Sequence, residues 1–155
     1  MLYQLQEVLV FLSTLDFKKI VIIEDNGFYQ ELIKKHFHDN DYQVTCFETG
    51  EDFFAFKTNP DLVILDYNLA GNINGLDVLK RLKNEDLDAP VIFLSSQKDM
   101  RVALDSLKEG AFDYVIKNED AFDNIDQAIS RFIIYSEAKE KKSKWTKFKF
   151  FRKKA

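Results

Sequence analysis

Short apolar segments recur along this chain, separated by segments with an amphipathic pattern. The clearest is Leu62–Leu65, which contains no polar residue and is followed at once by Asp66. Such a run is typical of a strand buried on both faces, as in a parallel sheet flanked by helices. Five segments are interpreted as strands: 18–25, 42–47, 61–66, 91–94 and 112–116.

A helical pattern follows each predicted strand. Apolar residues three or four positions apart predict five helices, at 28–37, over about eight residues after the capping residue Thr49, and at 75–83, 99–108 and about 120–135. Five repeats of strand and helix predict an α/β fold. Its sheet should be parallel, with right-handed crossovers and helices on both faces.

Two segments lie outside this alternation. Residues 1–17 carry leucines three or four positions apart, which predicts an amphipathic N-terminal helix. Three interpretations of that helix stay open: an extra helix docked on the domain, a contact in a homodimer, or an artefact of the chosen start codon. We divide the chain into this extension, a domain at 18–135 and a C-terminal tail at 136–155. The tail is too short for a DNA-binding output domain, so we expect none.

Length and composition narrow the class of protein. A chain of 155 residues corresponds to one domain. The single cysteine, Cys46, excludes an internal disulfide framework and fits a reducing compartment. The first basic residue is Lys18, so the charged start of a secretory signal is missing. No apolar run approaches the roughly 18 residues of a membrane-spanning helix. We therefore expect a soluble, cytoplasmic protein.

Charge is distributed unevenly along the chain. Residues 139–155 contain nine Lys/Arg and one Glu, a net charge of +8, whereas residues 1–138 contain 13 basic and 25 acidic residues, a net charge of −12. Trp145, Phe148 and Phe151 are interleaved with the lysines. Three interpretations of the tail stay open. It is a solvated segment, a binding segment for an anionic membrane surface or nucleic acid, or a segment that folds onto the acidic body.

Polar residues that can bind ions or take part in a reaction stand at the carboxyl ends of four predicted strands. They are Glu24 and Asp25, then Asp66, then Ser95, then Lys117. Ligands of open α/β sheets bind beyond this edge of the sheet. Three crowded carboxylates repel one another unless a cation neutralises them, and Mg²⁺ is the divalent ion that suits oxygen ligands. With an ammonium and a hydroxyl nearby, the set predicts a phosphoryl site whose nucleophile is a carboxylate.

From Lys18 to about Tyr135 the chain resembles a bacterial response-regulator receiver domain of two-component signalling. The resemblance is carried by the pair Glu24–Asp25, by Asp66 at the end of the third strand, by Ser95 in PVIFLSS and by GAFDYVIK ending in Lys117. It implies a three-layer, doubly wound (βα)5 flavodoxin-like fold with strand order 2-1-3-4-5. It also implies a single-domain phosphoacceptor with self-catalysed phosphotransfer and autodephosphorylation, not an enzyme that turns over a separate substrate.

The resemblance further implies roles for individual residues. Asp66 would accept a phosphoryl group from the phosphohistidine of a histidine kinase or histidine phosphotransfer protein. Asp25 and Asp66 would bind Mg²⁺ through carboxylates, Asn68 through its backbone carbonyl, and Glu24 mainly through water. Ser95 and Lys117 would contact phosphoryl oxygens.

Two further roles concern switching and lifetime. Tyr114 would be the aromatic residue that turns inward as the segment after Ser95 moves. Asn68 and Gln97 occupy the two positions that tune the lifetime of the aspartyl phosphate.

Two departures from the family pattern affect loops. Asn118 stands where a cis proline usually follows the lysine, and because a cis bond before a non-proline residue costs about 3–4 kcal/mol, we expect a trans peptide there. The loop after Asp66 lacks the usual proline and is one residue longer before Gly75.

Two other function classes compete with the phosphoacceptor. One is a degenerate receiver that acts as a phosphorylation-independent interaction module. The other is an aspartate-nucleophile phosphatase, whose DxD motif usually lies on the first strand; here Asn68, not an acid, stands two residues after Asp66.

Overall fold

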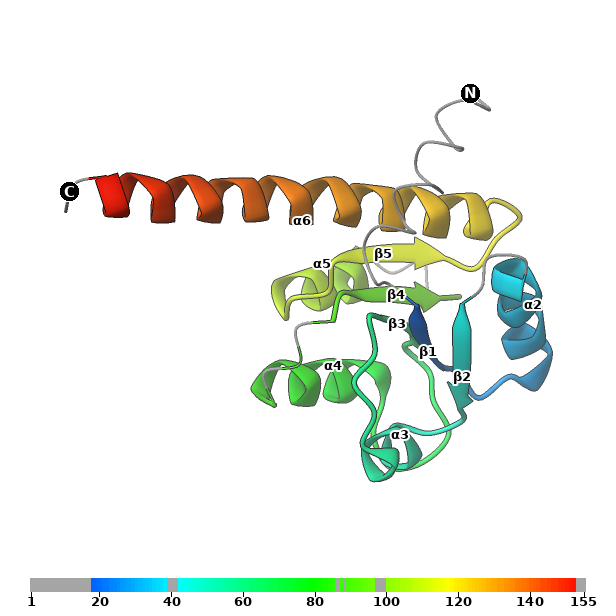
Figure 1. Ribbon diagram of the computed structural model, residues 1–155. Helices are drawn as coiled ribbons and strands as arrows, with labels where there is room; N and C mark the ends of the chain where they lie inside the picture. The colour runs from blue at the N-terminus through cyan, green and yellow to red at the C-terminus, as the bar shows by residue number, and fades with distance from the viewer. Residues whose placement is uncertain (1–17, 39–41, 86, 88, 97–99, 153–155) are drawn as a thin grey trace.

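The computed structural model describes residues 18–38, 42–85, 87, 89–96 and 100–152, and its strands form one parallel sheet. The strand order is β2-β1-β3-β4-β5, as predicted. The predicted helix at 1–17 lies outside the described residues. The elements are β1 (Lys19–Ile23), α2 (Gly27–Phe37), β2 (Gln43–Phe47), α3 (Gly50–Phe56), β3 (Leu62–Asp66), α4 (Gly75–Asn84), β4 (Val91–Ser95), α5 (Met100–Lys108), β5 (Asp113–Ile116) and α6 (Ala121–Arg152) (Figure 1).

Local sequence signals explain where several helices begin. The side chains of Asn26 and Thr49 accept hydrogen bonds from backbone N–H groups in the first turns of α2 and α3. At α4, Asn74 and Asp77 each accept a hydrogen bond from the other's backbone N–H, which is a capping box. These caps satisfy helix N–H groups that otherwise have no partner.

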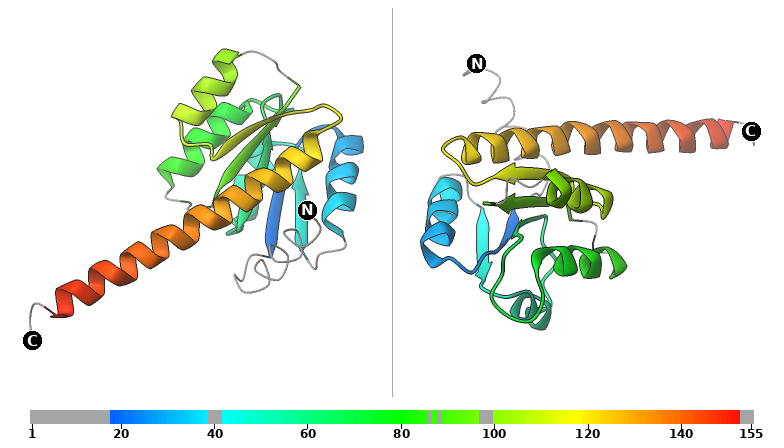
Figure 2. Two further views of the ribbon diagram at one scale, coloured as in Figure 1. Left: turned by 90° about the horizontal axis from the view of Figure 1, so that it is seen from above. Right: turned by 180° about the vertical axis from the view of Figure 1, so that it is seen from behind.

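The sheet separates two apolar cores, because successive strand residues point to opposite faces. On one face, Ile20 and Ile22 of β1 pack with residues of α2 and α6. On the other face, Val21 and Ile23 pack with residues of α3 and α4. Figure 2 shows the helices on the two sides of the sheet. β3 and β4 are buried along their whole length, as their apolar sequences predicted.

α6 is longer than the sequence pattern predicted. It was expected to end near Tyr135, but it continues without a break to Arg152 and leads away from the sheet (Figures 1 and 2). The apolar face ends near Ile133, which is why periodicity stops there. Residues 136–152 contain no glycine or proline and are rich in lysine, so nothing in them ends a helix. Its direction argues against the interpretation in which the tail folds onto the acidic body.

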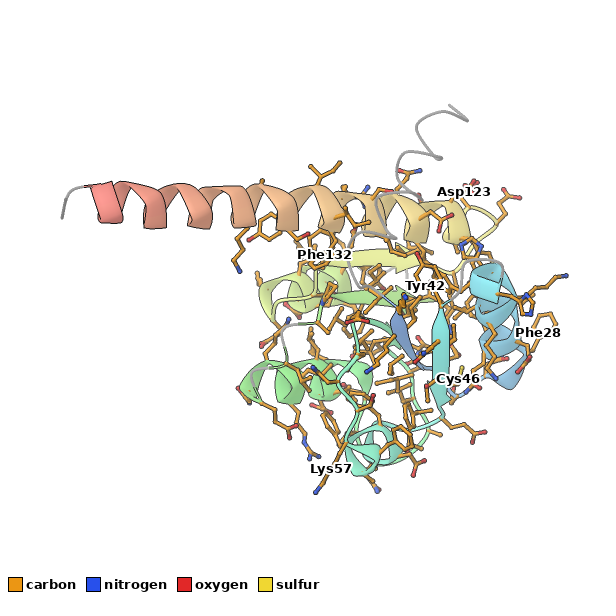
Figure 3. The ribbon with its side chains drawn as sticks, in the orientation of Figure 1. Phe28, Tyr42, Cys46, Lys57, Asp123 and Phe132 are labelled. Carbon is orange, nitrogen blue, oxygen red and sulfur yellow. The ribbon has the colours of Figure 1, made fainter. Side chains whose placement is uncertain are left out.

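The first half of α6 is the part that packs on the domain. Phe132 points from α6 toward the sheet (Figure 3) and meets Phe112 edge to face, with ring centroids 5.3 Å apart. Within the described ranges all peptide bonds are trans, including the one before Asn118, as predicted. None of the helices in this part of the chain combines the length and the apolar content that a membrane crossing requires.

Candidate functional site

The predicted site residues meet because parallel strands end at one edge of the sheet. In the register of the sheet Ile23 pairs with Leu65, Asp66 pairs with Leu94, and Ser95 pairs with Ile116. The residues at or just after these strand ends therefore come from β1, β3, β4 and β5 in turn. The sheet thus brings a pair of carboxylates, a third carboxylate, a serine and a lysine to the same edge.

Three carboxylates lie close together at this edge. Glu24, Asp25 and Asp66 each offer an oxygen, and these oxygens all lie within 4.8 Å of one another. Glu24 and Asp66 are only 1% and 4% exposed, whereas Asp25 is exposed. Buried charges of one sign at this spacing need compensation.

Lys117 provides part of that compensation. Its ammonium donates a hydrogen bond to Asp66 Oδ2 at 2.7 Å, lies 2.5 Å from Glu24 Oε2, and sits 4.7 Å from the centre of the Tyr29 ring. Burial by itself lowers the pKa of Lys117, but the bonds to Asp66 and Glu24 outweigh it and leave the pKa above its usual value. Lys117 is therefore charged and links β5 to β1 and β3.

Glu24 is fixed by its neighbours on both the backbone and the side chain. Its Oε1 accepts a hydrogen bond from the backbone N–H of Asn26 at 3.2 Å, and its carbonyl accepts one from the side chain of Gln30 at 2.5 Å. Burial raises the pKa of Glu24, and the contact with Lys117 offsets part of that rise. Its side chain is thus held inside the site, behind the exposed Asp25.

Asp66 is followed by an acceptor loop, residues 67–74, that turns closely over it. The backbone N–H of Asn68 faces Asp66 Oδ1 at 3.4 Å, which is a weak hydrogen bond. The loop closes through a bond from the N–H of Gly75 to the carbonyl of Tyr67 at 2.9 Å. A Cβ on Gly75 would lie 2.1 Å from the carbonyl oxygen of Asp66. Glycine is therefore required there, a role that the sequence analysis missed.

Two further predicted residues, Ser95 and Tyr114, lie on β4 and β5. Ser95 is fully buried at the end of β4, and its carbonyl accepts a hydrogen bond from the N–H of Lys117 at 2.9 Å. Tyr114 is half-buried and stacks on Phe93, with ring centroids 6.3 Å apart and planes 13° apart. Gln97 lies outside the described residues.

The donor set fits a hard divalent cation. Three carboxylates carry three negative charges, and Lys117 offsets one of them, so the site has a surplus of negative charge. Carboxylate and carbonyl oxygens are the ligands that Mg²⁺ prefers, and it usually keeps several waters. The exposed position of Asp25 leaves one side of the set open to water. The residues present therefore suit the ion that the sequence predicted.

Comparison with known proteins identifies the family. The sequence model of the response regulator receiver domain family matches residues 20–130, which is most of the described domain. The chain belongs to this family. Receiver domains are phosphoacceptors of two-component signalling rather than enzymes with a separate substrate, and they bind Mg²⁺ at an acidic cluster of the kind formed here by Glu24, Asp25 and Asp66.

Individual relatives agree with the assignment to the receiver family. The chain is 28% identical over 101 residues to the virulence transcriptional regulatory protein PhoP of Salmonella choleraesuis, a match that covers 64% of this chain and 45% of that protein. The chain thus spans less than half the length of that relative.

Solved structures show the same receiver fold. The signal receiver domain of a LuxO repressor protein from Vibrio parahaemolyticus matches with a TM-score of 0.71 at 25% identity, covering 79% of this chain and 95% of that one. The response regulator TrrA of Thermotoga maritima, solved in complex with Mg²⁺-BeF, matches with a TM-score of 0.64 at 31% identity, covering 74% and 97%.

Proposed function

We propose that this receiver domain accepts a phosphoryl group on Asp66 in an Mg²⁺-dependent reaction. The donor would be a histidine kinase or a histidine phosphotransfer protein, and phosphorylation would change the surface of the domain. The observation that carries the proposal is the position of Asp66. Its carboxylate is buried at the carboxyl edge of the sheet, accepts a hydrogen bond from Lys117 and is flanked by two further carboxylates.

The proposed step is a displacement at phosphorus. A carboxylate oxygen of Asp66 attacks the phosphorus, the P–O bond forms, and the P–N bond to the donor histidine breaks. The imidazole leaves with the electron pair and takes up a proton. Phosphoryl transfer mainly requires positioning and charge stabilisation, so side chains that are already in place supply most of what is needed.

The neighbouring side chains have separate tasks. Lys117 would move its hydrogen bond from the carboxylate of Asp66 to a phosphoryl oxygen, and Ser95 would contact another. Asp25 and Asp66 would hold Mg²⁺ with the carbonyl of Asn68, and Glu24 would act mainly through water. When bound, the ion neutralises the carboxylates and the phosphoryl oxygens.

The test uses a small phosphodonor. With acetyl phosphate and MgCl₂, the intact mass of the full chain should rise by one phosphoryl group. Asp66→Asn should abolish the gain, and Lys117→Ala should weaken it. Asp105→Asn, an exposed carboxylate of α5, is the matched control and should label normally. Equal labelling of wild type and Asp66→Asn would overturn the assignment.

The same experiment separates the other two function classes. A degenerate receiver would fold normally and bind its partner without gaining mass. A phosphatase would release phosphate from a small phosphoester with many turnovers, and we expect no such turnover.

We also propose that the tail binds an anionic membrane surface. The supporting observations are the continuation of α6 to Arg152, away from the acidic body, and the net charge of +8 between residues 139 and 155. Each basic residue near an anionic bilayer contributes about 1 kcal/mol. The cytoplasmic location predicted from the sequence would give the tail access to such a surface.

Vesicle binding tests this second proposal. Binding of the full chain should increase with anionic lipid content and decrease with salt, and the emission of Trp145, the only tryptophan, should shift to the blue. Equal sedimentation of full-length protein and residues 1–138, with no blue shift at low salt, would exclude the membrane. Nucleic acid would then be the next partner to test.

A further inference from the structure

The acceptor loop is anchored to a helix that carries none of the predicted site residues. Glu51, in the first turn of α3, accepts a hydrogen bond on Oε1 from the backbone N–H of Asn72 at 2.9 Å. This bond joins residues 21 positions apart in the sequence. It is also the largest cause that lowers the pKa of Glu51, so the side chain is charged when it accepts the bond.

Other contacts between α3 and the loop show that the Glu51 bond belongs to a docked segment. Thr49, which caps α3, forms an isolated parallel bridge with Ala70. Gly71 has φ +102°, and a Cβ there would lie 2.8 Å from Glu51 Oε2. Gly50 leaves room for Ile73, since a Cβ on Gly50 would lie 2.8 Å from Ile73 Cδ1. The middle of the loop thus rests on the first turn of α3.

The two ends of the loop are tied to the site itself. At its start, the N–H of Asn68 faces Asp66 Oδ1; at its end, Gly75 lies against the carbonyl of Asp66. The loop contains no proline, so its conformation depends on such contacts. A constraint on Asn72 therefore limits where the Asn68 backbone can lie relative to Asp66.

We propose that Glu51 is a positioning residue for the acceptor site: it fixes the acceptor loop so that the Asn68 carbonyl faces the carboxylates of Asp25 and Asp66. The proposal rests on the proposed function, because it assigns that carbonyl to Mg²⁺. Glu51 itself does not touch the metal or the phosphoryl group. It acts through the backbone N–H of Asn72, and groups that orient metal ligands in this way affect metal affinity.

The chain offers a matched control on the next residue. Asp52 accepts a hydrogen bond from the hydroxyl of Thr49 at 2.8 Å and so stabilises the start of α3 without any described bond to the loop. Asp52→Ala removes a carboxylate from the same helical turn. Glu51→Gln keeps an oxygen that accepts the Asn72 bond, whereas Glu51→Ala does not.

The first readout is binding of Mg²⁺, measured on the full chain by NMR titration with MgCl₂. Glu51→Ala should raise the Mg²⁺ concentration at half-saturation by about two- to tenfold, the net effect expected for one hydrogen bond. Glu51→Gln and Asp52→Ala should stay within about twofold of wild type. The second readout is hydrogen exchange of the Asn72 amide, which Glu51→Ala should accelerate and Asp52→Ala should not.

Different outcomes separate this inference from the proposed function. If wild type gains mass on Asp66 and Glu51→Ala binds Mg²⁺ as wild type does, the positioning role is wrong. An equal loss in Asp52→Ala would also overturn it, since weakening of α3 would then explain the effect. If wild type binds Mg²⁺ but gains no mass, the proposed function fails while the Glu51 effect on Mg²⁺ still stands. A wild type that binds no Mg²⁺ would overturn both.

Discussion

The edge strand β5 contacts two helices, and these two helices pack on the domain very differently. α6 buries five apolar residues and is joined to other elements by Asp126, which bonds His36 of α2, and by Arg131, which pairs with Asp113 of β5. In α5 the one fully buried residue is Ser106. The buried apolar residues of α6 are Ala121, Ile125, Ala128, Ile129 and Ile133.

The sequence pattern of α5 does not predict this weak packing. Met100, Leu104 and Leu107 recur three or four positions apart, which is the pattern of a buried helix face. They are nevertheless 73%, 47% and 44% exposed. The hydroxyl of Ser106 donates a hydrogen bond to the carbonyl of Ala103 within the same helix, at 2.8 Å. α5 is therefore attached to the sheet by far less apolar contact than α6.

This difference in packing indicates which of the two helices beside β5 can shift when the site changes. Lys117 follows β5, and Ser95 ends β4 next to it, so both helices adjoin the candidate site. Tyr114 packs on Phe93 in the core on the α3 and α4 side of the sheet, not in the core of α6. Because a shift of α6 would break a buried core, α5 is the helix beside β5 that can shift at the lower cost in free energy.

The largest expected effect compares one substitution in each helix. Ile125→Ala in α6 should lower the free energy of unfolding by about 2–5 kcal/mol, because a fully buried side chain leaves a cavity. Leu104→Ala in α5 should lower it by less than about 1 kcal/mol, because nearly half of that side chain is already in water. Urea denaturation of both variants measures the difference. Equal losses would show that α5 is as firmly packed as α6.

Hydrogen exchange sharpens the comparison without substitutions. Amides of α5 should exchange through openings that cost at least about 2 kcal/mol less than those of α6 between Ile125 and Ile133, because few apolar contacts oppose local opening. α4 is the matched internal control, since it is of similar length and buries Val78, Leu79 and Leu82. Protection in α5 equal to that in α4 would contradict the weak packing of α5.

The sequence predicted the parts of the molecule that depend on local pattern. Uninterrupted apolar runs located β3 and β4, and the position of Asp66 and Lys117 at strand ends placed them at one edge, because parallel strands share that edge. The family resemblance added the strand order, which the structure confirms, and the roles of the site residues, which stay predictions.

Features that depend on distant contacts were not predictable in the same way. The bond from Asn72 to Glu51 joins the acceptor loop to the first turn of α3, and no spacing rule points to it. The need for glycine at position 75 comes from the carbonyl of Asp66, which is visible only once the loop has closed. The exposed face of α5 breaks the rule that amphipathic spacing means burial. The length of α6 was missed because apolar periodicity reports packing on a core, and α6 continues to Arg152, well past Ile133, the last of its buried residues.

The smallest expected effect concerns the attachment of α6 to α2 and depends on pH. His36 Nε2 lies 2.8 Å from Asp126 Oδ1, and the ring stacks on Phe122 of α6 with centroids 4.9 Å apart. The hydrogen bond to Asp126 raises the pKa of His36 above its usual value of about 6.5, although burial opposes it. A raised pKa in the folded state means that folding favours the protonated ring. The stabilisation is therefore complete below about pH 6.5 and is lost as pH rises through the folded-state pKa.

Because both side chains are partly in water, this stabilisation should stay below about 1 kcal/mol. The difference in unfolding free energy between wild type and Asp126→Asn, measured in urea, should thus be larger near pH 6 than near pH 8.5. An NMR titration of the His36 ring should show its pKa fall in Asp126→Asn. A free-energy difference that is the same at both pH values, or that grows with pH, would mean that the protonated His36–Asp126 pair does not help to hold α6. The contrast with α5 would then rest on the buried apolar residues of α6 and on the pair of Arg131 with Asp113.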